Sequence, residues 1–513
     1  MKLQLITGND IVFFDKPAGF SVDLRQKGSQ DLCDIVEIEL RQKIYPVYQP
    51  DGATTGATLF AQTEKKSREL SQLILEQKIQ RTYLFMTDQR SEEFELDAHS
   101  IIQKKGPHFQ NDPSLPDQAN AHTRFRRIKR TPFFELWEAH PMTDQTHQIR
   151  LHAAQVGLPI LGDTLNGGST FPHLCLHCQN ITVPEETPWT SAPPRFFERM
   201  GLAKDPTLVQ WLVEIDRRQR LYNFLKYPDK TLRLIHRPEL RLDLFASQIW
   251  FYWFQDSLPN KGDLLRIEFI GELLGRPWFL QIMQDRGSNP HERQVFQSED
   301  WQSQWTAKEN NFLFELRAAQ GQSPGLFLDQ RRNRQLVFSK SKQRRILNLF
   351  SYTCGFSVFS ALGGADQVTS VDVSGNFLDW GKTNLRLNQL DPSRYEFFVQ
   401  DSLLFLKGSQ KRGRLFDLII CDPPSFGRHK SSVFRLDKNL SELLQLCWSC
   451  LEDGGEMLFS CNLQKWSRVD LQTQIRKTLP KAKISLLSQD LDFETPSDES
   501  ILKALWIQKR SVV

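Results

Sequence analysis

Four polar positions in the C-terminal third of the chain each follow an apolar run that is typical of a β-strand. Asn348 lies in the first run and precedes a turn of small residues that ends at Gly355; Asp372 ends the second run, and Asp401 follows the third. Asp422 follows the fourth run and begins an Asp-Pro-Pro sequence. In an open parallel sheet the ligand binds at the carboxyl ends of the strands, so we expect these side chains to surround a nucleoside-containing ligand.

Each of these positions can be given a role toward such a ligand. The carboxylate of Asp372 can accept hydrogen bonds from both hydroxyls of a ribose, and Asp401 is placed to bind an adenine amino group. The turn that contains Phe350, Ser351 and Tyr352 lets the backbone approach the ligand closely. A single acidic residue after a strand is more often a helix cap, so the prediction depends on all four positions occurring in order.

Three residues from separate parts of the N-terminal region could form a second site. They are Asp51 in a turn-like segment, Tyr83 in an apolar run and Arg150 in a Thr-His-Gln-Ile-Arg sequence. An arginine beside an aspartate keeps the carboxylate ionised and fixes its rotamer, and a tyrosine ring offers a stacking face to a nucleic-acid base. Taken alone, Asp51 would more often be a turn carboxylate.

The elements that must position these residues divide the chain into three predicted segments. Residues 1–194 contain many short strand-like runs and few long helices, which indicates an α+β domain. Residues 195–329 are interpreted as a linker and a small α+β domain, with 264–269 as one of its strands. Proline-rich residues 183–194 predict a linker or an extended tail.

Residues 330–513 alternate apolar strands with helical patterns, which is typical of a parallel sheet with crossover helices. The strands are predicted over 345–350, 368–372, 395–400, 416–421 and 456–461, and helices over 376–388 and 439–451. This pattern predicts a Rossmann-like α/β domain whose strand ends carry the first site.

Composition places the chain among globular proteins. Hydrophobic residues make up 39% and charged residues 25%, the net charge is +4, and there are eight cysteines. Few, irregularly spaced cysteines favour reduced thiols in the cytosol. The sequence shows neither a signal-peptide pattern nor an apolar run long enough for a bilayer. We therefore expect a cytoplasmic protein with no membrane partner.

Basic residues concentrate at 124–130 and 331–345, where they suit phosphate backbones, although a solvated protein face would look the same. Cys447 and Cys450 lack a second cysteine pair. His173, Cys175, His177 and Cys178 lie in a predicted strand and do not all share one face. We therefore expect no metal site.

Four motifs in the C-terminal region resemble those of bacterial 23S ribosomal RNA methyltransferases of the RlmI and RlmK kind. That family carries G-x-[FY]-L-D-x-R, N-x-F-x-Y-T-G, S-V-D and D-P-P-x-F, and this chain has matching runs at 325–331, 348–354, 370–372 and 422–426. The one departure is Cys354, which stands where the family has glycine. The resemblance implies a class I methyltransferase domain over 330–513 that binds S-adenosyl-L-methionine and methylates RNA, with the middle segment on the substrate side.

The resemblance leaves the methylated atom open between cytosine C5 and guanine N7. Cys461 ends a Phe-Ser-Cys run like that of the cytosine enzymes, where a thiolate adds to ring carbon 6; Asp422 would then remove the ring proton. The second strand and its helix are more similar to the RlmK guanine-N7 enzymes, which need no cysteine. A buried Cys461 that acts only as a small hydrophobe is equally compatible with the sequence.

The N-terminal region resembles RluA-type pseudouridine synthases across about residues 1–190. The order of motifs implies that Asp51 is the catalytic aspartate, Tyr83 the base-stacking tyrosine and Arg150 the arginine that pairs with the aspartate. The family's H-R-L-D is replaced by Tyr48-Gln49-Pro50-Asp51, and Asp144-Gln145 stands where the family has Gly-Arg. We therefore expect the fold and RNA binding to be kept, and leave open whether uridine is isomerised.

Together the two resemblances predict a multifunctional RNA-modification enzyme whose partner is RNA, with 23S ribosomal RNA as the expected substrate. Two alternatives remain from the sequence alone. One is a protein or small-molecule methyltransferase that uses the N-terminal fold for recognition. The other is a non-catalytic factor that binds ribosomal RNA or assists ribosome assembly. The sequence does not indicate an oligomeric state.

Overall fold

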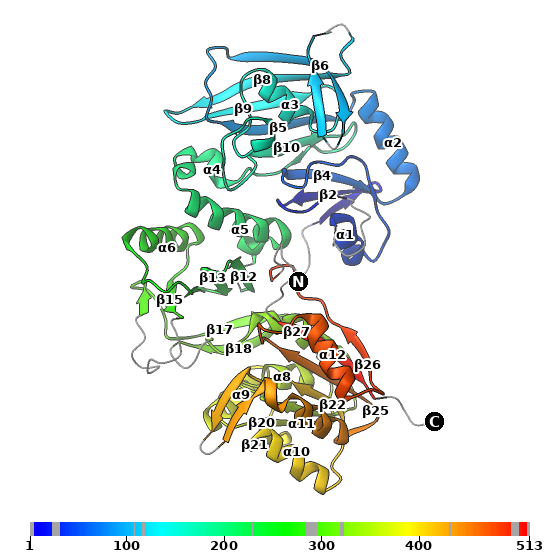
Figure 1. Cartoon of the computed structure of the whole chain (residues 1–513), viewed down its shortest axis with the longest axis vertical. Helices are drawn as coiled ribbons and strands as arrows, with labels where there is room; N and C mark the ends of the chain where they lie inside the picture. Colours follow the sequence, from blue (N-terminus) through cyan, green and yellow to red (C-terminus); the bar gives the residue numbers. More distant parts are fainter. Residues whose placement is uncertain are drawn as a thin grey trace. The chain divides into compact units, whose positions relative to one another are not determined.

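The computed structural model describes residues 5–22, 31–106, 108–114, 118–227, 229–283, 295–318, 323–429, 432–493 and 502–509. The chain divides into two compact units, Met1–Tyr227 and Pro228–Val513, and each is described by itself (Figure 1). Among the described residues, no helix combines the length and the apolar character needed to cross a membrane.

The first unit is built on an eleven-stranded sheet with the order β1-β2-β4-β10-β5-β9-β8-β6-β7, where β3 pairs with β4 and β11 with β10. The strands are β1 (Leu5–Gly8), β2 (Ile11–Lys16), β3 (Tyr45–Pro46), β4 (Thr55–Ala61), β5 (Gln80–Thr87), β6 (Glu95–Lys105), β7 (His108–Asp112), β8 (Ala121–Arg130), β9 (Glu135–Pro141), β10 (Leu176–Thr182) and β11 (Trp189–Thr190). The helices are α1 (Leu32–Leu40), α2 (Glu64–Leu75), α3 (Gln148–Gln155), α4 (Arg195–Glu198) and α5 (Pro206–Tyr222), with short 3₁₀ turns at Thr164–Asn166, Met200–Lys204 and Phe224–Lys226.

Residues 183–194, expected to be a linker or tail, are part of this unit. Trp189 and Thr190 extend the sheet as β11, and the buried Ser191 donates a hydrogen bond to Asp15 at 2.7 Å. Helix α5 also belongs here, because Arg220 near its end contacts Asp15 and the Ser191 hydroxyl. The first unit thus extends to Tyr227, about thirty residues beyond the boundary expected at residue 194.

The second unit contains a seven-stranded sheet with the order β21-β20-β19-β22-β25-β27-β26, of which the first five strands are parallel. The strands are β19 (Arg345–Leu349), β20 (Gln367–Asp372), β21 (Glu396–Val399), β22 (Phe416–Cys421), β25 (Leu451–Cys461), β26 (Lys483–Leu486) and β27 (Lys503–Gln508). The helices are α7 (Arg331–Lys340), α8 (Gly355–Leu362), α9 (Gly375–Leu387), α10 (Ser402–Lys411), α11 (Leu436–Ser449) and α12 (Arg468–Thr478), and a hairpin pairs β23 (Phe426–His429) with β24 (Ser432–Arg435). The predicted Rossmann-like α/β fold is confirmed.

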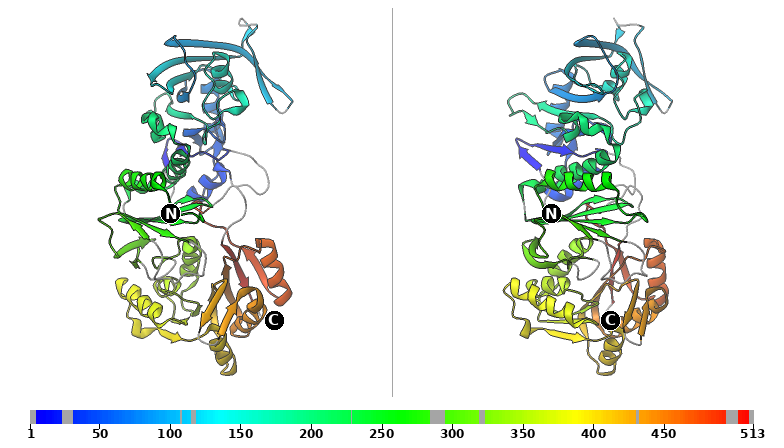
Figure 2. Two further views of the ribbon diagram at one scale, coloured as in Figure 1. Left: turned by 60° about the vertical axis from the view of Figure 1, so that its left-hand side comes forward. Right: turned by 90° about the vertical axis from the view of Figure 1, so that its left-hand side faces the viewer.

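Helices cover both faces of this sheet, as the views in Figures 1 and 2 show. Successive strand residues point to opposite faces, so Leu347 of β19 packs with α10, α11 and α12, while its neighbour Ile346 packs with α7 and α8. Burial on both sides explains why these strands are continuous apolar runs and were recognisable in the sequence.

The middle segment forms a five-stranded sheet, β12-β13-β14-β15-β16, and a separate hairpin of β17 and β18. The elements are β12 (Thr231–His236), β13 (Leu240–Phe245), β14 (Gln248–Trp253), α6 (Lys261–Leu274), β15 (Trp278–Ile282), β16 (Val295–Gln297), β17 (Gln304–Glu309) and β18 (Phe312–Arg317). The prediction of a strand at 264–269 is wrong, because these residues lie in α6. Its buried residues Ile267, Ile270, Gly271 and Leu274 have helical spacing, and Asn260 with Asp263 forms a capping box.

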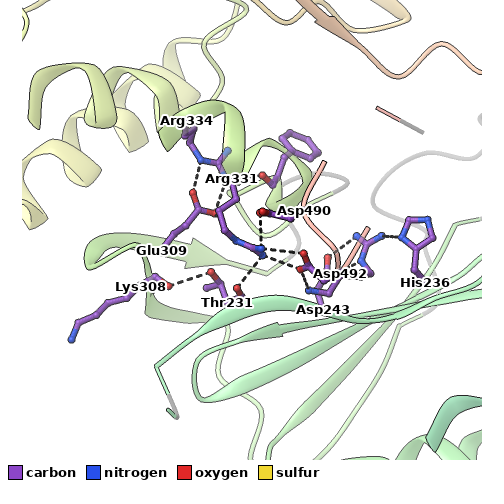
Figure 3. A network of polar contacts seen from close by, with 11 residues as sticks. Thr231, His236, Asp243, Lys308, Glu309, Arg331, Arg334, Asp490 and Asp492 are labelled. Atoms are coloured by element: carbon purple, nitrogen blue, oxygen red, sulfur yellow. Dashed lines mark hydrogen bonds and ion pairs between the residues drawn. The ribbon is translucent and has the colours of Figure 1, made fainter. Parts of the chain in front are cut away.

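A buried ionic network joins this middle segment to the parallel sheet (Figure 3). Arg331, only 2% exposed, donates to both carboxylate oxygens of Asp492 at 3.1 Å and to Asp490 at 3.0 Å. The same guanidinium donates to the carbonyl of Thr231, and Arg334 forms two hydrogen bonds of 2.6 and 2.7 Å with the side chain of Glu309. The network therefore links β12, β17, α7 and the segment that precedes β27.

Replacing Arg331 with methionine should lower the free energy of unfolding of this unit by about 3 kcal/mol. The reason is that Asp492, which is fully buried, would lose its cationic partner while remaining out of water. Urea unfolding followed by tryptophan fluorescence would measure the change. An Arg332→Met variant is the control, because that neighbouring arginine is exposed; equal stability of the two variants would contradict the prediction.

Candidate functional sites

The turn between β19 and α8 has an unusual backbone. Phe350, Tyr352 and Cys354 all have positive φ, at 54°, 47° and 61°, although none is glycine. The Tyr352 amide donates to Asp372 Oδ2 at 2.9 Å, which fixes the turn against the end of β20. Non-glycine residues in the left-handed region concentrate where a site requires a particular backbone path. The turn ends at Gly355, where the positive end of the α8 dipole begins.

Cys354, the departure from the family motif, occupies a left-handed position that favours glycine. Its side chain is completely buried and faces α9. A Cβ added at Gly381 of that helix would lie 2.3 Å from the Cys354 sulfur, so the absence of a side chain at 381 makes room for the thiol. The cysteine is therefore accommodated on the side of the turn that faces the protein core.

The polar residues predicted around the cofactor occupy different kinds of environment. Asp372 Oδ1 accepts from the Ser374 amide at 2.9 Å, and its carboxylate is half-buried at the sheet edge. Asn348 is 2% exposed, and its side chain donates a hydrogen bond to Ser357 Oγ in the first turn of α8. Asp401 caps α10 by accepting from the Leu404 amide at 3.1 Å. The structure brings these residues to the carboxyl edge of the sheet; a direct role of each toward the cofactor stays a prediction.

Asp422, directly after β22, is held by a chain of side-chain hydrogen bonds. Ser460 Oγ donates to Asp422 Oδ1 at 2.7 Å and accepts from Gln330 Nε2 at 3.0 Å; Asn333 Nδ2 donates to Gln330 Oε1 at 2.6 Å. Burial raises the pKa of Asp422 to about 7, against the lowering effect of the Ser460 hydrogen bond. The carboxyl group can therefore change its charge close to neutral pH.

Cys461 lies near enough to Asp422 for that carboxylate to contribute to raising the pKa of its thiol, but its side chain packs elsewhere. It follows Ser460 on β25 and so points to the opposite face, where it packs with Met457 and Phe459 in the core beneath α11 and α12. Its exposed fraction is 1%, and burial raises the pKa of its thiol to about 11. The interpretation of Cys461 as a small buried hydrophobe therefore fits this environment better than a thiolate does.

In the first unit, the three predicted residues converge on one pocket of about 180 Å³. Asp51, Tyr83 and Arg150 all line it. The remaining walls come from the segment around Tyr48, from β5 and from the segment that leads into α3; they include Tyr48, Gln49, Pro50, Arg81, Asp144 and His147. The volume is sufficient for one nucleobase and a few waters.

The carboxylate of Asp51 contacts an arginine and a histidine. Arg150 Nη1 donates to Asp51 Oδ2 at 2.9 Å, and His147 Nε2 lies 3.2 Å from Oδ1. Arg150 is fixed in turn by Asp163, which accepts two hydrogen bonds of 2.8 and 2.6 Å. Burial raises the pKa of Asp51, but the hydrogen bonds and charges of His147 and Arg150 together bring it below its ordinary value. Asp51 is therefore an ionised, oriented carboxylate.

Two residues of this site escaped the sequence interpretation. Lys16 is 1% exposed and donates to the carbonyls of Gly52 and Thr54, on either side of the turn after Asp51, at 2.8 and 2.6 Å. Arg81, two residues before Tyr83, donates to Asp144 at 2.7 Å. Lys16 lies 35 residues from Asp51 in the chain, so only the pairing of β2 with β4 brings them together. Arg81 and Asp144 thus form an ion pair in the wall of the pocket.

Two arginines of the second basic cluster are engaged inside the protein, whereas most cations of the first cluster are exposed. Arg126 of β8 donates to Glu138 at 2.6 Å, and Arg331 and Arg334 belong to the buried network described above. The buried contacts favour a structural role over the expected phosphate binding for Arg331 and Arg334. The exposed first cluster remains compatible with both phosphate binding and a solvated face.

Within the described residues, one group of three potential metal ligands was not anticipated: the ligand atoms of Asp97, His99 and His122 lie within 4.8 Å of one another. His122 Nε2 and Asp97 Oδ1 are 2.8 Å apart, and Arg124 approaches the same carboxylate at 3.6 Å. These contacts account for the cluster without an ion. His177 belongs to the His/Cys group at residues 173–178 for which no metal was expected. Its two ring nitrogens contact Thr55 Oγ1 and the Ser191 carbonyl.

Comparison with protein families gives a match within each unit. Residues 10–155 match the model of RNA pseudouridylate synthases, and residues 275–477 match that of S-adenosylmethionine-dependent methyltransferases. The curated relatives include the ribosomal RNA large subunit methyltransferases K/L of Shewanella sp. strain ANA-3, 40% identical over 173 residues, and of Shewanella pealeana, 41% identical over 155 residues. These matches cover 33% and 30% of this chain and 24% and 21% of the relatives, so the chain spans about a quarter of their length.

Solved structures agree with the assignment of the second unit. A protein described as a methyltransferase, complexed with SAH, is 25% identical and superposes with a TM-score of 0.52, covering 59% of this chain and 80% of that one. A S-adenosylmethionine-dependent methyltransferase from Streptococcus mutans has 24% identity, the same TM-score and the same coverage, and shows the same fold. The predicted combination of domains and the predicted cofactor class are confirmed.

Proposed function

We propose that this chain, which joins an RNA pseudouridylate synthase domain to an S-adenosylmethionine-dependent methyltransferase domain, modifies the RNA of the large ribosomal subunit through both domains. Two findings support this substrate. The relatives of the second unit are named as methyltransferases of large-subunit ribosomal RNA, and the family matched by the first unit acts on RNA. Action on ribosomal RNA implies a cytoplasmic location.

The methyl acceptor is a ring nitrogen, guanine N7, rather than cytosine C5. Methylation at C5 needs a thiolate that adds to the pyrimidine ring, and all five cysteines of the second unit, Cys461 among them, are buried. Guanine N7 carries a lone pair and needs no such thiolate. The burial of Cys461 on the core face is the observation that carries this choice.

The residues of the turn fit the cofactor. The half-buried carboxylate of Asp372 retains free lone pairs for the ribose hydroxyls, while the backbone from Phe350 to Tyr352 lines the approach. When bound, S-adenosylmethionine supplies an electrophilic methyl group. The ionised carboxylate of Asp422 stabilises the positive charge that a purine gains when its nitrogen accepts that group.

The first unit isomerises uridine. Asp51 is held as an ionised carboxylate between Arg150 and His147, at the floor of a pocket that also contains Tyr83. A fixed carboxylate can attack as a nucleophile, and the tyrosine offers its ring to the base. The segment Tyr48–Asp51, which differs from the family motif, is still fixed in position beside the pocket. Tyr48 is buried, and its hydroxyl donates to the carbonyl of Ala57 at 2.9 Å.

Mass spectrometry of nucleosides from ribosomal RNA would test both activities in a strain that lacks the chain. We expect loss of one N7-methylguanosine and one pseudouridine, and return of both when the wild-type chain is supplied.

A Cys461→Ala variant should restore the methyl mark, with an activity within about threefold of wild type. Loss of 5-methylcytosine that Cys461→Ala fails to restore would establish the cytosine alternative; a complete set of modifications would favour a protein methyltransferase or a non-catalytic assembly factor.

The pH dependence of methyl transfer should follow the ionisation of Asp422. Because burial raises its pKa to about 7, the carboxylate fraction and kcat/KM should rise from pH 6 to pH 8 and then level off. The Ser460 hydrogen bond lowers this pKa, so Ser460→Ala should move the midpoint to higher pH, and Ser460→Thr should restore it. A profile whose midpoint is the same in all three proteins would exclude Asp422 as the titrating group.

A further inference from the structure

Arg241, the second residue of β13, combines an aromatic contact with a buried polar atom that has no partner. Its guanidinium carbon lies 4.2 Å from the ring centroid of Phe254. Its Nε atom is buried and has no hydrogen-bond partner, and no carboxylate in the described part of the chain forms an ion pair with it. A buried polar atom without a partner calls for an explanation such as an ion or ligand that binds there.

Two other arginines of this unit have the carboxylate partner that Arg241 lacks. Arg233 forms two hydrogen bonds with Asp243, and Arg334 forms two with Glu309. Arg241 instead lies close enough to Arg233 for the two charges to repel. Burial and this repulsion lower the pKa of Arg241 to about 10. Arg241 is therefore a partly desolvated cation that the nearby charges of Asp243 and Asp329 offset only in part, and a bound anion would stabilise it.

Its position places this cation next to the methyl-transfer site. Tyr252 lies directly opposite Arg241 in the register of β13 and β14 and belongs to the same hydrophobic cluster as Leu326 and Leu328. Phe327, between these two leucines in the chain, contacts Tyr352 of the cofactor turn with 5.3 Å between ring centroids. Asp329 links the same two regions, because its charge acts both on Arg241 and on Asp422. An anion held by Arg241 would thus lie on the side of the middle sheet that faces the cofactor turn and Asp422.

We propose that Arg241, stacked on Phe254, binds a backbone phosphate of the RNA that enters the methyl-transfer site. Stacking on the phenyl ring fixes the plane of the guanidinium and leaves the edge that carries its two terminal nitrogens free for two phosphate oxygens. Such a contact positions the strand without reading its sequence. The inference rests on the proposed function, since the RNA substrate supplies the phosphate, and it gives the middle segment a defined part in substrate binding.

Fluorescence anisotropy with a labelled 12-nucleotide single-stranded RNA, measured between 50 and 300 mM KCl, tests the proposal on the full chain. For Arg241→Gln we expect about tenfold weaker binding at the lowest salt concentration and a salt slope smaller by about 0.7, the value for one phosphate contact on a single strand. Arg241→Lys keeps the charge but cannot form the paired contact, so its affinity should be intermediate. Arg317→Gln is the matched control, because Arg317 also stacks on an aromatic ring, Trp380 at 4.6 Å, but is already paired with Glu315.

Calorimetry with SAH separates the phosphate from another anion that could reach Arg241, the carboxylate of the cofactor. SAH affinity unchanged in Arg241→Gln, together with the altered salt slope, supports the phosphate site. An unchanged salt slope, or an equal change in Arg317→Gln, overturns the proposal, as does a loss of SAH affinity with intact RNA binding.

These results are independent of the modified nucleotide. A wild-type chain that binds RNA through Arg241 but does not methylate ribosomal RNA would refute the proposed function alone.

Discussion

Replacing Asp422 with asparagine should slow methyl transfer to ribosomal RNA by roughly 10²-fold, the usual effect of removing one oriented electrostatic group from an active site. Asparagine has almost the same shape and can still accept the Ser460 hydrogen bond, so the loss reports on the charge. The carboxylate is needed when the purine becomes positively charged, and a neutral amide cannot stabilise that charge. Single-turnover transfer of a labelled methyl group to RNA from the deletion strain measures the effect.

The affinity for SAH should change less than the rate in this variant, because Asp422 is only one of the four polar positions expected around the cofactor and Asp372 remains to bind the ribose. Asp379→Asn is a suitable control, since Asp379 is an exposed aspartate of α9 that pairs with Lys382. If Asp422→Asn loses SAH affinity in proportion to its rate, the residue serves cofactor binding. If it retains the full rate, another group stabilises the acceptor.

Replacing Asp51 with asparagine should abolish pseudouridine formation, with a decrease of roughly 10⁴-fold or more, as is typical when the nucleophile of a covalent mechanism is removed. The amide can fill the same space between Arg150 and His147 but cannot attack. Pseudouridine in ribosomal RNA can be counted after chemical derivatisation and reverse transcription. Methyl transfer by the same protein is an internal control, because Asp51 and Asp422 belong to different compact units.

An Asp51→Asn protein that restores pseudouridine to the deletion strain would exclude Asp51 as the nucleophile. Pseudouridine that is unchanged in the deletion strain would instead mean that the pocket serves RNA binding only. Arg150→Lys distinguishes the two situations further: lysine cannot contact Asp51 and Asp163 at once in the way the guanidinium does, so an active site should lose most of its rate while a binding pocket should lose only affinity.

The parallel sheet was predictable because both of its faces are buried. Strands such as β19 and β22 are then unbroken apolar runs, and the polar residue after each run marks the carboxyl edge where ligands bind. The same reasoning failed at α6, where Leu264, Leu265 and Ile267 look like a strand in isolation. Only the spacing across the whole of Lys261–Leu274 and the capping box at its start identify the helix.

The direction in which side chains point at the ends of strands also could not be predicted from the sequence. Ser460 and Cys461 are adjacent, and both could have faced the acceptor; the register of β25 with β22 directs Ser460 to Asp422 and Cys461 into the core. Likewise, nothing in the sequence near Lys16 connects it with Asp51. Their proximity depends on strand pairing over long distances, which no local pattern encodes.

The buried network around Arg331 also bears on how the protein is made. Asp492 accepts a hydrogen bond from the backbone of Arg233, a residue synthesised 259 positions earlier, and pairs with Arg331 as well. Strand β27 enters the sheet between β25 and β26 later still. At ribosomal elongation rates of roughly 5–20 residues per second, the Arg233 segment emerges about 10–50 s before its partner. During that interval the first unit can complete its fold, while Arg331 and the open edge of β25 await the residues that complete the second unit.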